Sequence, residues 1–457
     1  MTLGAAEDAV RSSDLVGART QMTVLRIAGF RAARITSIWQ PGQTAPRDGE
    51  LQVLKNVEAA AQLTGMRVYL AVFHAGSRTT PLTAEMQNDF ARWAAAIARE
   101  VPAIDDLIIG NEPNINRFWL PQFGPAGENV AAPTYLSLLT KTYDALKAVD
   151  PQLRVWGGAL SPRGSDRAGT ARDTHSPTRF LLDLGAAYRA SGRQTPIMDG
   201  LAIHPYGENS SISPELAHPR NTVIGIADYT KLVGLLSQAF DGTAQKGSTL
   251  PIVYAEYGVE STVPDGKRLL YSGNEPATTR PVDEQKQAAY YAKALELTFC
   301  QPNVEGFFVF HTIDEKPLDR WQSGLFYADG TPKSSYVPVR EALARARGGS
   351  IARCPGLALP VEATTIRYPG RLEVQNKGIT VRLRCDLDCV YSVRLRKVAT
   401  GATTIARRGR GRAGVLSLVS LGRGRVAPGR YFYTVQLRHP VNPAAPTVLT
   451  SEPFRLP

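Results

Sequence analysis

Two glutamates in this sequence stand where an acidic side chain does nothing for folding. Glu112 follows the apolar run Leu107–Gly110, and Glu256 follows the apolar run Ile252–Ala255. A carboxylate at the end of a buried strand must stay solvated or be paired, so it lowers stability unless it has another role. Two carboxylates, one giving a proton and one attacking as a nucleophile, are the groups that cleave a glycosidic bond. The pattern therefore predicts that Glu112 and Glu256 are catalytic.

The elements that must position these glutamates alternate along the first 350 residues. The predicted strands are Thr2–Glu7, Ala33–Trp39, Arg67–Phe73, Leu107–Gly110, Arg154–Ala159, Gly200–His204, Ile252–Ala255 and Gly306–His311. A predicted first helix ends near Gly29, and the others are Leu51–Thr64, Met86–Arg99, Tyr135–Val149, Thr178–Ala190, Ile226–Phe240, Glu284–Phe299 and Val337–Arg347. Eight such pairs predict a (β/α)8 TIM barrel. An open doubly wound sheet is the alternative, but no GxGxxG fingerprint follows any predicted strand.

A barrel would bring the two glutamates together. Glu112 ends the fourth predicted strand and Glu256 the seventh, and the carboxyl ends of all barrel strands form one rim. The alternative for either glutamate alone is a salt bridge at this rim. That alternative does not explain why both glutamates stand at matching strand ends.

The segment Asn111-Glu112-Pro113 resembles the Asn-Glu-Pro motif of clan A retaining glycoside hydrolases, which include family 5 cellulase-like and family 39 enzymes. The resemblance covers roughly residues 1–345. It implies that Glu112 is the general acid/base, that Asn111 binds the sugar 2-hydroxyl and that Glu256 is the nucleophile. It also implies a carbohydrate substrate, a β-glycoside, oligosaccharide or polysaccharide. No cofactor and no metal are expected.

Four more residues match positions that support the reaction in this clan. Arg34 matches a strand-2 arginine that keeps the nucleophile ionised, and His74 matches a sugar-binding histidine. In the segment His204-Pro205-Tyr206, the resemblance places His204 near the acid/base and the Tyr206 hydroxyl on the nucleophile. The alternative for any single histidine is an ordinary core or rim position.

The predicted eighth strand departs from the clan pattern. Many members carry a tryptophan there that stacks under the sugar, whereas this chain has Phe310 and His311, followed by Trp321. Further candidates for contact with a sugar are Trp39, Phe118, Trp119, Asp314 and Glu315. Aromatic planes suit the apolar faces of sugars. The alternatives are loop-core packing for the aromatic residues and loop solvation for the acidic ones.

The period of the hydrophobic pattern changes after a Gly-, Ala- and Pro-rich linker. Residues 1–346 are the predicted barrel, 347–360 the linker and 361–457 a second domain. The predicted strands of that domain are Ile379–Cys385, Cys389–Val398, Gly414–Val419 and Tyr431–Arg438. Short alternating strands separated by turns predict an antiparallel, Ig-like β-sandwich. The segment Gly409–Arg412 is predicted to be a mobile loop. The sandwich is expected to brace the barrel, with carbohydrate binding as the alternative.

Positive charge is concentrated in this C-terminal part. Residues 351–457 contain 18 of the 53 Lys and Arg residues but only 5 of the 41 Asp and Glu residues. One interpretation is contact with an anionic cell surface or acidic polysaccharide. The other is an arginine-rich solvated face. Nucleic acid is not an expected partner, because no helix-turn-helix, zinc-finger or RRM pattern is present.

The four cysteines favour two disulfides, Cys300–Cys354 and Cys385–Cys389. Disulfides indicate an oxidising compartment, so we expect an extracellular protein whose signal segment has been removed. Four reduced thiols in a cytoplasmic protein are the alternative. No apolar run approaches the roughly 18 residues of a membrane span, so none is expected.

Three other functions are alternatives to glycoside hydrolysis. A transglycosidase would share all of these residues. A non-catalytic carbohydrate-binding protein is disfavoured, because both glutamates are present. A metal-dependent barrel hydrolase would need His-x-His at the first strand, where this chain has Ala6-Glu7-Asp8. The sugar, the linkage and endo or exo action are left open.

Overall fold

The computed structural model describes residues 1–348, 380–384, 389–412, 415–421, 426–438, 447–451 and 453–456. The chain divides into two compact units, Met1–Arg353 and Cys354–Pro457. Most of the predicted linker lies outside the described residues, so its bounds stay a prediction. None of the helices in the described part of the chain is long and apolar enough to cross a membrane.

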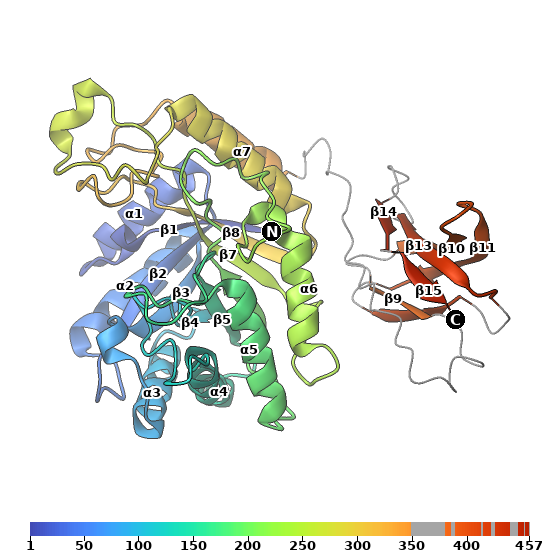
Figure 1. The fold of residues 1–457 in the computed structure, drawn as a ribbon. Helices are drawn as coiled ribbons and strands as arrows, with labels where there is room; N and C mark the ends of the chain where they lie inside the picture. Colours follow the sequence, from blue (N-terminus) through green and yellow to red (C-terminus); the bar gives the residue numbers. More distant parts are fainter. Residues whose placement is uncertain are drawn as a thin grey trace. The chain divides into compact units, whose positions relative to one another are not determined.

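The first unit is a closed barrel of eight parallel strands in chain order (Figure 1). The strands are β1 (Thr2–Ala6), β2 (Ala32–Trp39), β3 (Arg67–His74), β4 (Asp106–Ile109), β5 (Arg154–Leu160), β6 (Gly200–Ile203), β7 (Ile252–Tyr257) and β8 (Val304–Phe310). The pairing of β1 with β8 closes the ring. This confirms the predicted TIM barrel and excludes the open sheet.

Eight helices cover the outside of the barrel (Figure 1). They are α1 (Leu15–Ala28), α2 (Asp48–Thr64), α3 (Ala84–Glu100), α4 (Ala131–Val149), α5 (Pro177–Ala190), α6 (Tyr229–Phe240), α7 (Glu284–Phe299) and α8 (Tyr336–Arg347). Capping residues stand at the starts of α3, α5 and α7. Thr83, Ser176 and Asp283 each accept a backbone N–H of the first turn, which satisfies a donor that the helix leaves unpaired. Gly29 ends α1 with a φ of 109°, a conformation that favours glycine.

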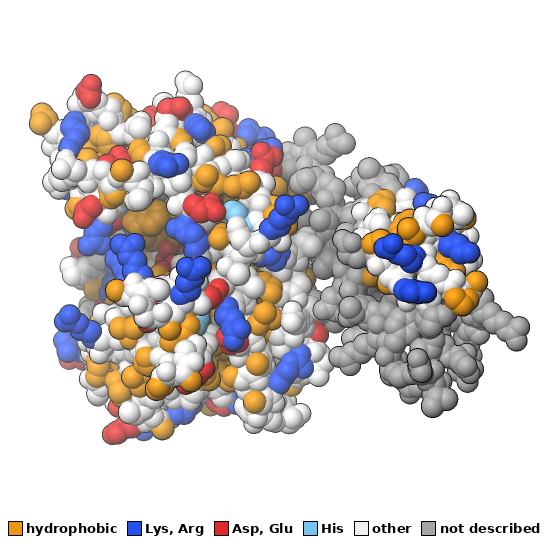
Figure 2. Space-filling view, in the orientation of Figure 1, with side chains coloured by type: hydrophobic (Ala, Val, Ile, Leu, Met, Phe, Trp, Pro, Cys, Tyr) orange, Lys and Arg blue, Asp and Glu red, His pale blue; other side chains and the backbone are white. Residues whose placement is uncertain are grey.

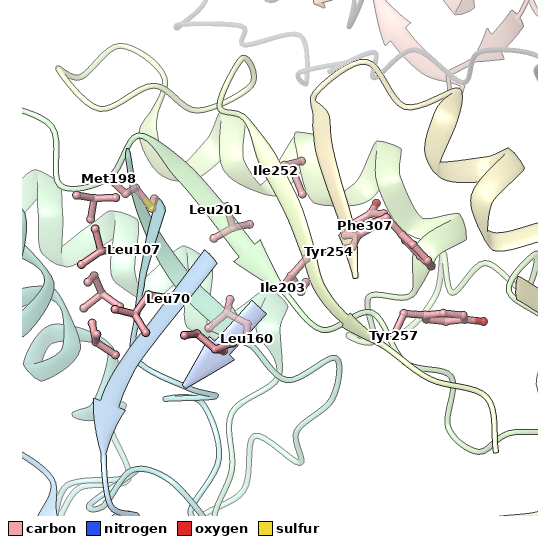
Figure 3. Close-up of a cluster of buried hydrophobic side chains, with 14 of the residues drawn as sticks. Leu70, Leu107, Leu160, Met198, Leu201, Ile203, Ile252, Tyr254, Tyr257 and Phe307 are labelled. Atoms are coloured by element: carbon pink, nitrogen blue, oxygen red, sulfur yellow. The ribbon is translucent and has the colours of Figure 1, made fainter. Parts of the chain in front are cut away.

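The strands are buried on both faces, which explains their continuous apolar runs. Along β3, Tyr69 and Ala71 belong to the cluster inside the barrel, whereas Leu70 and Val72 belong to the layer between strands and helices. Figure 3 shows side chains of this outer layer, contributed by six neighbouring strands from Leu70 on β3 to Phe307 on β8. Large side chains fill the interior, where the rings of Tyr69 and Phe308 lie 4.8 Å apart. The barrel is therefore solid, and a ligand can be held only at its ends.

A buried carboxylate ties together the amino ends of three strands. Asp106, the first residue of β4, is fully buried. It accepts hydrogen bonds from Nε of Arg67 at 2.6 Å and from Nε1 of Trp156 at 2.9 Å. This end of a TIM barrel usually serves stability.

The second unit is built from antiparallel strands, as predicted. One sheet contains β11 (Thr403–Gly411), β10 (Cys389–Lys397), β13 (Gly429–Arg438), β14 (Thr447–Thr450) and β15 (Phe454–Leu456). A separate pair joins β12 (Leu416–Ser420) to β9 (Thr380–Arg384). Their apolar faces share one core, which includes Val393, Val419 and Val435. The arrangement fits a small sandwich.

The prediction of a mobile loop at Gly409–Arg412 is wrong. Residues 403–411 form strand β11, in which Gly409 pairs with Tyr391 of β10. A β-carbon at Gly409 would meet the hydroxyl oxygen of Tyr391 at 2.3 Å, so only glycine leaves room for this ring. The glycine–arginine repeat looked like low complexity, but its glycines serve strand packing.

Candidate active site

A cleft of about 740 Å³ opens at the carboxyl ends of the barrel strands. It is lined by residues of β1, β2, β3, β7 and β8 and by the segments that follow β1, β4, β5, β6, β7 and β8, and both Glu112 and Glu256 face it. Figure 2 shows the hollow on the barrel unit, with Lys and Arg side chains at its edge. The strand-end glutamates thus share one site, as the sequence predicts.

The backbone at Glu112 is held in an unusual conformation. Its φ is 44°, in the left-handed region that ordinary residues avoid, and Gly110 before it has a φ of 90°. The N–H of Glu112 donates to the carbonyl oxygen of Ala159 on β5 at 2.9 Å. A left-handed non-glycine residue costs about 1–3 kcal/mol, and such strain gathers at functional sites. The turn aims the carboxylate of Glu112 into the cleft.

Glu256 is held by two donors from other strands. Nη1 of Arg34 lies 2.7 Å from Oε1 of Glu256, and the Tyr206 hydroxyl donates to Oε2 at 3.0 Å. Burial opposes the charge on Glu256, but His204, Arg34 and the Tyr206 hydroxyl outweigh it, so its pKa lies below the ordinary value of 4.5. Arg34 also donates from Nη2 to Oδ1 of Asn111 at 3.3 Å. The buried guanidinium therefore links the two glutamate-bearing strands.

His204 lies between the two carboxylates. Its Nδ1 is 3.1 Å from Oε1 of Glu112 and 3.5 Å from Oε2 of Glu256. The sum of these distances is an upper limit on the separation of the two oxygens. That limit admits the roughly 5–5.5 Å that separates the two carboxyl groups of retaining glycosidases.

An aromatic wall stands beside Glu256. The ring of Trp321 packs 4.9 Å from Tyr206 and 5.2 Å from Phe310, and all three line the cleft. The loop after β8 thus folds back and brings Trp321 to the site. His311 and Glu315 also line the cleft, where Oε2 of Glu315 accepts the backbone N–H of Trp321 at 3.1 Å.

Four candidate residues do not reach the cleft. Trp39 is fully buried and packs on Phe90, and Trp119 lies between His74 and Tyr135. This is the loop-core packing given above as the alternative. His74 is 3% exposed and bonded to the Gly76 carbonyl; burial lowers its pKa to about 4. Asp314 is buried in an ion pair with Lys333 at 2.8 Å, so it does not face a sugar.

Several cleft residues were not predicted from the sequence. Glu260 lines the cleft at 8% exposure, and burial raises its pKa to about 7. The sequence feature that could have indicated Glu260 is its position four residues after Glu256, on the loop that follows β7. Glu7 and Asp8 also line the cleft. In the sequence they only disfavoured a metal site, because they stand where His-x-His would be needed. Four rim arginines were missed as well: Arg117, Arg163, Arg172 and Arg320.

The cysteine predictions fall partly outside the described residues. Cys354 and Cys385, one partner of each predicted disulfide, lie outside them, so both pairings stay predictions. In the described part of the chain, no group of three or more His, Cys, Asp or Glu side chains is arranged to hold a metal ion.

Solved structures share this fold at low sequence identity. GH5_18 from Streptomyces cattleya, in complex with GlcNAc, matches with a TM-score of 0.51 and 16% identity over 76% of this chain and 80% of that one. A variant of GH5_18 in complex with Manβ1-4GlcNAc gives a TM-score of 0.52 and 16% identity over 78% and 82% of the two chains. A β-glucuronidase from Bacteroides uniformis gives 0.47 at 14% identity over 99% of this chain, which spans only 45% of that protein's length. At these identities the likeness to the two GH5_18 structures concerns the fold alone. No protein-family model matches the sequence, and no curated protein matches it.

Proposed function

We propose that this protein is a retaining glycoside hydrolase that cleaves β-linked glycosides through a covalent glycosyl-enzyme intermediate. The observation that carries the proposal is the pair Glu112 and Glu256, held in one cleft on either side of His204 Nδ1 at 3.1 and 3.5 Å. The likeness to GH5_18 supports the scaffold only, so the chemistry rests on this geometry.

The two carboxylates have environments suited to different roles. Glu256 is paired with Arg34 and accepts the Tyr206 hydroxyl, so it stays ionised and can attack an anomeric carbon. Glu112 has no arginine or lysine within ion-pair distance among the described residues, and its side chain contacts the imidazole of His204 instead. In the first step Glu112 gives a proton to the leaving oxygen while Glu256 forms the bond to the sugar. Glu112 then takes a proton from the water that releases the sugar.

The other groups in the cleft would hold the substrate. Asn111 is oriented by Arg34 and is placed to bind a sugar hydroxyl next to the reacting carbon. Trp321 offers a ring face on the Tyr206 side, suited to the apolar face of a sugar. Glu7, Asp8, Glu260 and Glu315 supply acceptors for further hydroxyls.

Replacing each glutamate and adding azide tests both roles. Glu256→Ala should abolish turnover of aryl β-glycosides, and azide should restore activity by giving the α-glycosyl azide, because it enters from the face that Glu256 has left. Glu112→Ala should still react with activated aryl glycosides, and azide should give the β-glycosyl azide. NMR of the products distinguishes the two.

A matched control keeps the result interpretable. Glu315→Ala removes another glutamate of the same cleft that contacts neither Arg34 nor Tyr206, so it should raise KM, but its turnover should not depend on azide. Substantial turnover by the Glu256→Ala variant without azide would refute the assignment, as would the same azide anomer from both alanine variants.

We also propose that the protein works outside the cell with two disulfides, Cys300–Cys354 and Cys385–Cys389. The even number of cysteines supports this. Titration of the unfolded protein should find no free thiol before reduction and four after it. Four free thiols in protein purified without a reductant would exclude the disulfides.

A further inference from the structure

The second unit carries a basic surface whose layout follows from strand register. Val393 and Leu395 of β10 are fully buried in the core. Because side chains alternate along a strand, Ser392, Arg394 and Arg396 point to the opposite, outer face of the sheet.

The neighbouring strands add three more arginines to this face. Ser392 pairs with Arg408 of β11, and Val390 pairs with Arg410 of β11 and Arg438 of β13. Residues paired across strands place their side chains on the same face. We call this surface the basic face; its members are Arg394, Arg396, Arg408, Arg410 and Arg438.

A shallow hollow of about 260 Å³ lies in the basic face. Its lining includes Ser392, Arg394, Arg408, Gln436 and Arg438. The hollow thus combines three guanidinium groups with a hydroxyl and an amide.

Two donors on this face have no protein partner among the described residues. The Oγ of Ser392 and the Nε of Arg396 are both shielded from solvent and make no hydrogen bond there. Buried polar groups are usually satisfied, so such atoms indicate a missing partner.

Acidic side chains are scarce in this part of the chain. The described residues from 380 onward contain no Asp or Glu, and residues 351–457 hold 18 Lys and Arg against 5 Asp and Glu in all. On the visible side of this unit, Figure 2 shows basic but no acidic side chains among the coloured atoms. The excess of positive charge favours an anionic partner.

We propose that the basic face binds an acidic polysaccharide. The backbone positions of arginines two residues apart on one strand are separated by roughly 6.6–6.8 Å, and neighbouring strands lie about 4.7–4.9 Å apart. This lattice offers several contacts to a polymer that repeats a carboxylate or sulfate along its chain, because arginine binds such groups through paired hydrogen bonds. Ser392 and Gln436 supply groups for sugar hydroxyls. The proposal goes beyond the proposed catalysis and does not depend on it.

The test compares the full-length protein with two triple variants of equal net charge. The first variant, Arg394→Gln/Arg408→Gln/Arg438→Gln, removes the arginines of the hollow. The control is Arg19→Gln/Arg47→Gln/Arg99→Gln, which removes three exposed arginines of the barrel unit. Binding is measured by calorimetry at about 0.1 M salt, with polygalacturonate as the carboxylated probe, heparin as the sulfated probe and dextran as the neutral one.

Wild type and control should bind polygalacturonate or heparin but not dextran. Which of the two probes binds more tightly identifies the anionic group. The first variant should bind about thirtyfold more weakly, roughly threefold for each guanidinium, as is typical of exposed ion pairs. All three proteins should melt alike and hydrolyse a small aryl glycoside alike, so a failure of the proposed catalysis would show separately.

Three results would overturn the proposal. The first is absence of binding to both acidic probes. The second is an equal loss of binding in both triple variants, which would make the effect one of net charge alone. The third is tighter binding to double-stranded DNA or to phosphatidylserine vesicles at the same salt, which would assign the basic face to another class of polyanion.

Discussion

Arg34 gives the sharpest test of how the site is tuned. Its guanidinium lies 2.7 Å from Glu256, and the two side chains are 3% and 13% exposed. Removing one partner of a buried ion pair costs about 3–5 kcal/mol, because the other charge stays buried. His204 and the Tyr206 hydroxyl remain near Glu256 and offset part of this cost. We therefore expect Arg34→Gln to lower the free energy of unfolding by about 3 kcal/mol.

The same loss of interaction energy should raise the pKa of Glu256. It should therefore shift the acid limb of the pH–activity profile, the range where activity falls as pH is lowered, to higher pH. One pH unit of pKa corresponds to 1.36 kcal/mol, so the pKa of Glu256 should rise by about two pH units in Arg34→Gln. In the wild type that pKa lies below 4.5. The acid limb of kcat/KM on an aryl glycoside should therefore move up by about two pH units from its wild-type position below pH 4.5. Arg34→Lys keeps the positive charge but loses the planar guanidinium. The acid limb of this variant should therefore shift less than that of Arg34→Gln.

Stability supplies a second measurement that needs no substrate. Because the pKa of Glu256 is lowered by folding, its charge contributes stability above pH 4.5, and this contribution is lost as pH falls through the folded-state pKa. In Arg34→Gln the charge at pH 7 is buried without its partner. The destabilisation measured in urea should therefore be largest at neutral pH and should shrink as pH falls through the raised pKa of Glu256 in the variant.

A second arginine, which is ion-paired but partly exposed, provides the control. Arg67→Gln breaks the ion pair with Asp106 at the other end of the barrel, so it should lower stability without moving the acid limb. The reasoning fails if the acid limb of Arg34→Gln coincides with that of the wild type, or if Arg67→Gln moves the limb equally.

Three further predictions follow from other contacts. Tyr206→Phe removes the hydrogen bond to Glu256, so kcat should fall about 10–100-fold with KM nearly constant; an unchanged kcat would contradict this. The pKa of Glu260 rises from 4.5 to about 7 on folding, so the wild type should lose about 3 kcal/mol of stability between pH 4.5 and 7, and Glu260→Gln should abolish that slope in urea unfolding. Gly185→Ala should lower the free energy of unfolding by about 1–3 kcal/mol, because a β-carbon there meets the backbone of α6 at 2.6 Å. Gly234→Ala, where a β-carbon would lie in open space, should raise it by about 0.4–1 kcal/mol. Changes of the opposite sign in urea unfolding would refute the packing argument.

The barrel could be predicted from sequence because its strands and helices carry strong local signals. Apolar β-branched runs of four to eight residues alternate with longer amphipathic segments, and each period indicates one kind of element. The strand-end glutamates could be found because a charge after a buried strand conflicts with folding. Strand β11 was missed because its glycines and arginines lack alternation, and the need for Gly409 appears only once the Tyr391 ring is placed beside it.

The outer part of the cleft depends on loops that carry no such period. Trp321 returns to Tyr206 from the loop after β8, whereas Trp39, directly at a strand end, turns into the core. Nothing in their local sequence distinguishes these two tryptophans. Glu260 was missed for the same reason, since only the folded loop shows that it is buried in the lining of the cleft.

Strand β4 and the turn after it carry two carboxylates with opposite roles. Asp106 at the start fastens neighbouring strands together, while Glu112, just past the end, faces the cleft. The groups that keep the fold intact are thus set apart from the groups that do chemistry, with a packed apolar interior between them. A variant library that raises heat resistance can be aimed at the amino-terminal end of the barrel, and one that changes substrate preference at the carboxyl-terminal loops. Gains from the two libraries should combine additively, because residues this far apart share no contacts.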